Sequence, residues 1–134
     1  MPTTNCLTGV CAPERTQGLQ APAPKATYPL VHLKGPGLFL AAEVTKQGGA
    51  TGLTFVSLDI DGRNVTNLSY AAAENSGLTQ QNPYGLVLLK SGAGLKNLTI
   101  GFPVPLRYEK ELKLSAIVNE DGVVQLLANV IHGA

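Results

Sequence analysis

Three small groups of residues carry side chains that could do chemistry, namely two cysteines, two histidines and a short acidic run. Cys6 and Cys11 both lie at the start of the chain, and no histidine or further cysteine nearby completes the four ligands of a zinc site. Three states remain open for this pair. They are free thiols in a reducing compartment, a bridge between the two that closes a short loop, and cross-links between subunits.

The histidines, His32 and His132, lie close to opposite ends of the chain. No cysteine or carboxylate pattern marks a metal site around either of them. The sequence also lacks a Gly-x-Ser-x-Gly nucleophile motif, a phosphate-binding loop and a dinucleotide fingerprint. We therefore expect structural histidines, no catalytic residues, no cofactor and no enzymatic activity.

The acidic run places Asp59, Asp61 and Asn64 at a spacing that resembles part of a calcium loop. The loop pattern requires a glutamate at its twelfth position, and Tyr70 stands there instead. A hairpin turn at Asp61-Gly62 accounts for the same residues, because glycine tolerates the positive φ of a type I′ turn. These three residues are the candidates for metal ligation, and we expect a turn without metal.

Composition limits the classes of partner. The chain has 134 residues, 44% of them hydrophobic, which suits one domain with a core of its own. Only 14% are charged and the net charge is +1, without a basic cluster. This argues against nucleic acid as a partner, since phosphate binding needs clustered lysine and arginine. No apolar run is long enough for a membrane span, so we expect none. A weakly charged surface favours packing against other protein.

The first 29 residues differ in composition from the rest, because they contain five prolines and their apolar residues show no period. We predict an extended, proline-rich N-terminal arm over residues 1–29, followed by one domain over residues 30–134. Such a segment buries too little surface to offset its own ordering entropy, so it needs a neighbouring subunit to hold it. The residues that we expect to anchor this arm between subunits are Cys6, Leu7, Val10, Cys11 and Leu19.

From residue 30 onward, short apolar runs alternate with glycine-rich turns. We predict about eight strands, at residues 30–34, 37–46, 53–60, 64–70, 84–91, 95–102, 111–118 and 123–131, and a helical turn at residues 71–75. Two prolines, Pro103 and Pro105, predict an edge or a corner over residues 102–106. The fold class is then all-β, an antiparallel sandwich of the jelly-roll type, with an immunoglobulin-like sandwich as the alternative.

This layout resembles small jelly-roll proteins that polymerise or coat a particle. An arm precedes a sandwich, and the apolar, proline-containing corner at residues 101–108 precedes the closing hairpin. Phage head decoration and fibre proteins are similar, as are subunits of bacterial spore appendages, whose cysteine-bearing N-terminal connectors join neighbours. Cys6 and Cys11 suit the second group, although residues 12–134 contain no cysteine to receive such a link. The resemblance is one of layout.

The function that we expect is structural and non-enzymatic. The chain would assemble into or onto a multi-subunit particle, as a phage capsid decoration or structural protein located in the virion. Its partners would be copies of itself, as a homo-oligomer, or a major structural protein of the particle. The alternatives are a subunit of an extracellular or spore-surface filament, and a binding module for glycans or a cell-surface ligand that uses the loops at residues 48–52 and 75–83.

Overall fold

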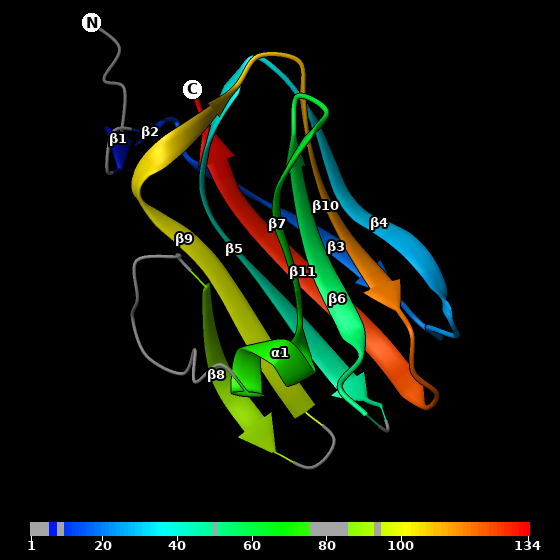
Figure 1. Ribbon diagram of the computed structural model, residues 1–134. Coiled ribbons are helices and arrows are strands. Elements are labelled where there is room, and N and C mark those ends of the chain that lie inside the picture. Colours follow the sequence, from blue (N-terminus) through cyan, green and yellow to red (C-terminus); the bar gives the residue numbers. More distant parts are fainter. Residues whose placement is uncertain (1–5, 8–9, 50, 76–85, 93–94) are drawn as a thin grey trace, which may run out of the picture.

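The chain folds into two antiparallel sheets packed face to face (Figure 1). The computed structural model describes residues 6–7, 10–49, 51–75, 86–92 and 95–134, and the side chains of residues 11–49, 51–73, 95–102 and 104–134. The four-stranded sheet has, in spatial order, β4 (Ala26–Lys34), β10 (Glu111–Val118), β6 (Thr54–Ile60) and β7 (Arg63–Ser69). The five-stranded sheet has β3 (Glu14–Gln20), β11 (Val123–Gly133), β5 (Gly37–Gly48), β9 (Leu95–Tyr108) and β8 (Leu86–Gly92).

The strand order is that of a jelly roll with one strand added. In an eight-stranded jelly roll, the first, eighth, third and sixth strands form one sheet, and the second, seventh, fourth and fifth form the other. Counting from β3 and setting β8 aside, this chain follows that order in both sheets. The predicted all-β jelly-roll sandwich is therefore confirmed, and the immunoglobulin-like alternative is not the fold. The additional strand, β8, lies between the fifth and sixth jelly-roll strands in sequence and at the edge of its sheet.

The predicted boundary at residue 29 needs correction, because β3 is the first strand of the jelly roll and pairs along its whole length with β11. Its composition hid it, since the strand is mostly polar and prolines stand on either side. What holds it is main-chain pairing and a close approach to β4. A Cβ built on Gly18 would lie 1.9 Å from the carbonyl oxygen of Leu30, so only glycine fits there. The predicted arm can therefore describe only the segment before Glu14.

The eight strands predicted from residue 30 onward correspond to β4 to β11, and the predicted helical turn lies within α1 (Tyr70–Asn75). Residues 84 and 85 of the fifth predicted strand lie outside the described residues. The largest difference is β9, which continues past both prolines to Tyr108. Ala41 pairs with Gly101 and Phe39 with Leu106, so residues 102–105 bulge where β5 contributes one residue. The predicted corner is thus a bulge inside a strand, visible as the bend of β9 in Figure 1.

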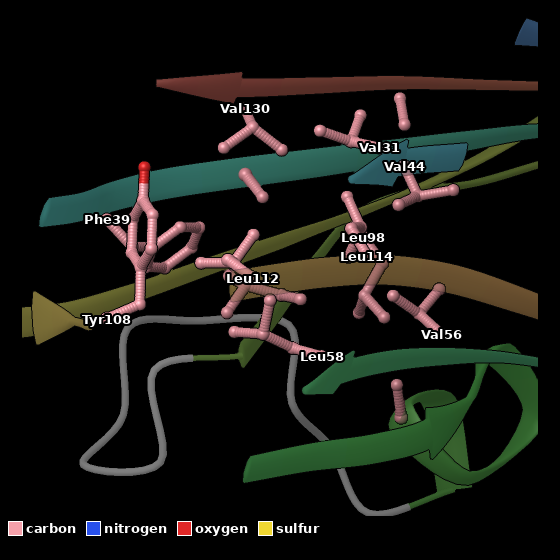
Figure 2. Close-up of a cluster of buried hydrophobic side chains, with 14 of the residues drawn as sticks. Val31, Phe39, Val44, Val56, Leu58, Leu98, Tyr108, Leu112, Leu114 and Val130 are labelled. Carbon is pink, nitrogen blue, oxygen red and sulfur yellow. The ribbon is translucent and has the colours of Figure 1, made fainter. Parts of the chain in front are cut away.

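The core lies between the sheets, where alternate residues of each strand point inward. On β10 the pattern is regular, with Leu112, Leu114, Ala116 and Val118 all buried. Figure 2 shows Leu112 and Leu114 of β10 among valines and leucines from both sheets. Burying one such side chain stabilises the fold by about 1.5–3 kcal/mol. Because these core side chains come from strands far apart in the sequence, contacts between distant parts of the chain hold the two sheets together.

Candidate assembly surfaces

Four of the five predicted arm anchors lie together in one small element. The strand β1 (Cys6–Leu7) pairs with β2 (Val10–Cys11), with Cys6 opposite Cys11 and Leu7 opposite Val10. Main-chain hydrogen bonds attach this element to the C-terminal end of the jelly roll. The amide of Cys11 donates to the carbonyl of Ala134 at 2.8 Å, and the amide of Ala134 donates to the carbonyl of Cys11 at 2.9 Å. The anchor segment is thus fixed to its own chain at Cys11.

The state of the cysteines is also determined. Cys11 is disulfide-bonded, and the structure contains no free cysteine among the residues that it describes. The only other cysteine of the sequence is Cys6, its backbone partner across the pair. Of the three states that the sequence left open, the structure has the bridge within the chain. A cross-link between subunits would require this bond to exchange.

The fifth predicted anchor, Leu19, lies on the edge strand β3 with 60% of its surface exposed. Its cross-strand partner is Leu127 of β11, and further along the same face Arg15 is opposite Ile131, which is 37% exposed. On the outer face beside the free edge, Leu19 with Leu127 and Ile131 beside Arg15 therefore give two apolar positions, separated by the polar pair Gln17 and Asn129. We call this set the β3 rim, comprising Arg15, Gln17, Leu19, Leu127 and Ile131.

The other edges differ from the β3 rim. In β4, Pro29 lacks an amide donor, and the pairing with β10 is shifted beside it, so this edge is interrupted. The edge strand β7 exposes Val65 at 43%. Around β7 the outer face is polar. The side-chain amide of Asn64 donates to the hydroxyl oxygen of Ser57 at 2.9 Å and to a carboxylate oxygen of Asp59 at 2.8 Å. Side chains of β8 lie outside the described residues.

A pocket of about 450 Å³ lies where β3, the end of β11 and the β4–β5 turn meet. His132 is buried there, with its Nε2 at 2.7 Å from the hydroxyl oxygen of Thr16. The Nδ1 atom of the same ring lies 3.7 Å from a carboxylate oxygen of Glu14. A hydroxyl, an imidazole and a carboxylate in this order resemble a nucleophile, base and orienting acid. Sequence reasoning missed this arrangement, because Thr16 was assigned to the arm.

The arrangement lacks features that acyl transfer needs. Glu14 is 71% exposed at its side chain and beyond hydrogen-bond distance of the ring, so it does not fix the imidazole. The amides of Cys11 and Ala134 beside the pocket are already paired with each other's carbonyls. They therefore cannot serve as oxyanion donors. The role that the geometry supports is structural, since the hydrogen bond between His132 and Thr16 joins β11 to the edge strand β3.

At the end of the sandwich where the β5–β6 and β10–β11 turns meet, a carboxylate is buried with four donors around it. Glu120 accepts from the ammonium of Lys46 at 2.8 Å and from the hydroxyl of Thr54 at 2.6 Å. Its other oxygen accepts from the amides of Thr51 and Gly52 at 3.1 and 3.0 Å. Both charged side chains are almost fully buried.

The donors outweigh the cost of burying the Glu120 carboxylate. Burial raises its pKa, but hydrogen bonds from Lys46, Thr54 and the two turn amides lower the pKa to about 2. The ammonium of Lys46 also lies 5.1 Å from the centre of the Tyr70 ring, within the range of a cation–π contact. Because both oxygens of Glu120 accept hydrogen bonds from its own chain, this site holds two turns together.

The three candidate metal ligands do not converge. Asp61 accepts hydrogen bonds from the amides of Glu109, Lys110 and Glu111 at 2.7–3.0 Å, and these amides lower its pKa. Its φ of 52° and the φ of 80° at Gly62 fit the predicted turn. Asp59 and Asn64 instead bond to each other. Among the residues that the structure describes, no group of three or more histidine, cysteine, aspartate or glutamate side chains could hold a metal ion.

Within the same described ranges, no helix is long and apolar enough to cross a membrane. In the loop suggested for glycan binding at residues 48–52, the amides of Thr51 and Gly52 donate to Glu120, and residue 50 lies outside the described residues. Most of the second suggested loop, residues 76–83, lies outside the described residues.

Comparison with known proteins gives a fold relationship. No protein-family model matches the chain, and no curated protein matches its sequence. Among solved structures, the chain is similar to one in the acidic stable capsid structure of Helicobacter pylori bacteriophage KHP30. The TM-score is 0.53 at 13% sequence identity, and the match covers 97% of this chain and 92% of that chain. At this identity the likeness shows the jelly-roll fold, over nearly the whole of both chains.

A chain in the structure of infectious bursal disease virus Gx strain is also similar over 98% of this chain, at 12% identity. This chain covers 45% of that one, and the TM-score of 0.27 is too low to support an argument.

Proposed function

We propose that this chain is a non-enzymatic structural protein of a virion, a capsid subunit or capsid decoration protein of a phage. It assembles with copies of itself or with a major structural protein of the particle. The proposal rests on the structural similarity to a chain of a phage capsid. The matched fold covers nearly all of this chain and nearly all of that one.

The site geometry supports the same proposal. The carboxylates of Glu120 and Asp61 are occupied by partners within the chain, and the amides of Cys11 and Ala134 beside the pocket at His132 pair with each other's carbonyls. What the described surface does offer is exposed apolar side chains, with Leu19 and Val104 each more than half exposed. Exposed apolar surface beside a strand edge suits association with protein.

The part of the chain before Glu14 is the proposed docking segment. The predicted anchors Leu7 and Val10 lie in the β1–β2 element, which is joined to the sandwich through Cys11. A segment attached at one point can present its remaining surface to a neighbouring subunit. In this proposal the anchors act from a folded element, and Cys6 and Cys11 maintain that element.

Light scattering on the purified full chain over a range of concentrations, followed by electron microscopy, tests the proposal. We expect the mean mass to rise with concentration and regular assemblies to appear. Replacing Leu7 and Val10 together by lysine should weaken assembly, while Val124→Lys, a change at a 55% exposed position outside the docking segment, should not. A chain that remains monomeric at every concentration would contradict self-assembly, and equal effects of both changes would contradict the docking segment.

A further inference from the structure

We propose that two copies of the chain join through antiparallel pairing of their β3 strands about a two-fold axis at Gln17. The two five-stranded sheets then form one continuous sheet. This inference rests on the proposed structural function and identifies one of its interfaces.

The first argument is that β3 is a free edge. Within the described part of the chain, β3 pairs with β11 on one side and is the end strand of its sheet. Alternate amides and carbonyls of an edge strand point outward without ladder partners. Natural edges are usually protected by proline, charged side chains or a bulge. Over Glu14–Gln20, β3 contains no proline, lysine or bulge, and its two charged residues, Glu14 and Arg15, lie together at one end. The prolines nearest to it, Pro13 and Pro22, stand outside the strand.

The second argument is that β3 is complementary to itself. Pairing about Gln17 aligns all seven residues of one strand with all seven of the other. Arg15 then lies opposite the partner's Leu19, and Glu14 lies opposite the partner's Gln20. No like charges face each other, which would weaken a cross-strand pair. The stem of each arginine covers one exposed leucine, and the two Gln17 amides meet at the axis.

The third argument is the surface beside the strand. The β3 rim places the exposed apolar side chains of Leu19 and Ile131 on either side of Gln17, so a second copy covers side chains as well as backbone. Other edges with described side chains lack this combination. Pro29 interrupts β4, and next to β7 the hydrogen bonds of Asn64 keep the outer face polar. A second copy fits β3 best because it supplies an identical edge in the matching register.

Cysteine cross-linking on the full chain tests the axis. Because Gln17 pairs with itself, Gln17→Cys should give a covalent dimer in most chains under mild oxidation. Arg15→Cys alone and Leu19→Cys alone should not, since each lies opposite a different residue. The double variant Arg15→Cys, Leu19→Cys should link again. No link from Gln17→Cys, or equal links from all three single variants, would overturn the inference.

A second measurement does not depend on a new disulfide. Leu19→Lys should raise the dimer dissociation constant by about tenfold or more, because the leucine is buried twice in each dimer. The matched control is Val65→Lys on the edge strand β7, at 43% exposure, which should leave the constant unchanged. Both positions are exposed in the monomer, so thermal melting should stay close to that of the unsubstituted protein. An unchanged constant for Leu19→Lys would overturn the inference.

The outcomes separate this inference from the proposed function. If regular assemblies form without a Gln17 link, the β3 interface is wrong and the structural function stands. If the Gln17 dimer forms but no larger assembly or particle association follows, the interface stands and the structural function is wrong.

Discussion

Glu120 and Lys46 show how a charged pair is accommodated in a small core. The strands predicted at residues 111–118 and 123–131 place Glu120 in the turn between them, and the sequence indicates no partner for it. A signal was present on β5, where Lys46 continues the alternation that places Ala42 and Val44 inside. A lysine on the inward face of a strand requires a buried acceptor. Which carboxylate supplies it depends on how two turns meet, and the spacing of residues does not contain that information.

Replacing Glu120 by glutamine should destabilise the fold strongly. The variant leaves the Lys46 ammonium buried without a counter-charge, and breaking such a pair costs about 3–5 kcal/mol. Urea unfolding measures the change. Asp121→Asn is the matched control, because its ion pair with Lys25 is exposed at both ends and should contribute less than about 1 kcal/mol. Similar losses of unfolding free energy in both variants would show that the buried ion pair of Glu120 contributes no more to stability than the exposed one.

The same carboxylate predicts a dependence on pH. Its folded pKa of about 2 lies below the ordinary glutamate value, so its stabilisation is fully present above that ordinary value. The stabilisation is lost as the pH falls from about 4.5 to about 2, and is on the order of 3 kcal/mol at 1.36 kcal/mol per pKa unit. Urea unfolding at several pH values should show this loss in the unsubstituted protein. A Glu120→Gln variant should show a shallower slope over the same interval.

At the scale of elements, periodicity located the strands after residue 30 well, because each combines alternation with glycine-rich turns. Simple alternation does not account for β5, where Phe39, Ala42 and Val44 are all buried, because the register against both β9 and β11 shifts between Phe39 and Ala41. A bulge changes the phase of alternation without leaving a mark in the sequence. β3 was missed for another reason. Its stability comes from main-chain pairing with residues more than a hundred positions away.

The close contact between β3 and β4 gives a prediction about this element. Gly18→Ala should cost about 1–3 kcal/mol, because the new methyl group meets the Leu30 carbonyl and the backbone must move. Gly101→Ala in β9 is the control, since a Cβ there meets nothing within 4 Å. Urea unfolding measures both, and amide exchange should show faster opening of β3 in the first variant. Equal stability of the two variants would contradict this view of Gly18.

At the scale of the whole molecule, assembly should depend little on salt. The chain has 14% charged residues and a net charge of +1, and the β3 rim contains one charged residue. Backbone pairing and apolar contact are screened far less than ion pairs. We expect the mean assembly mass at fixed protein concentration to change little between low and physiological ionic strength. Dissociation by moderate salt, followed by light scattering, would instead indicate an electrostatic interface.

The bridge at Cys11 makes a second prediction at this scale. Because Cys11 is bonded within its own chain, a non-reducing gel of the unsubstituted protein should show the monomer band. Reductant should leave the dimer that forms through β3 pairing intact. It should loosen the β1–β2 element and so weaken the proposed docking through Leu7 and Val10. A covalent dimer that disappears with reductant would point to exchange between subunits.

The reciprocal hydrogen bonds between Cys11 and Ala134 bring two positions far apart in the sequence to one corner of the molecule. A short peptide linker could therefore join residue 134 to residue 11 without crossing the sandwich. New ends could then be opened at the exposed Gly62, in the hairpin between β6 and β7. Such a circular permutant would lack residues 1–10, with the proposed anchors Leu7 and Val10, and would carry the jelly roll and its β3 edge alone, with both chain ends moved to the four-stranded sheet.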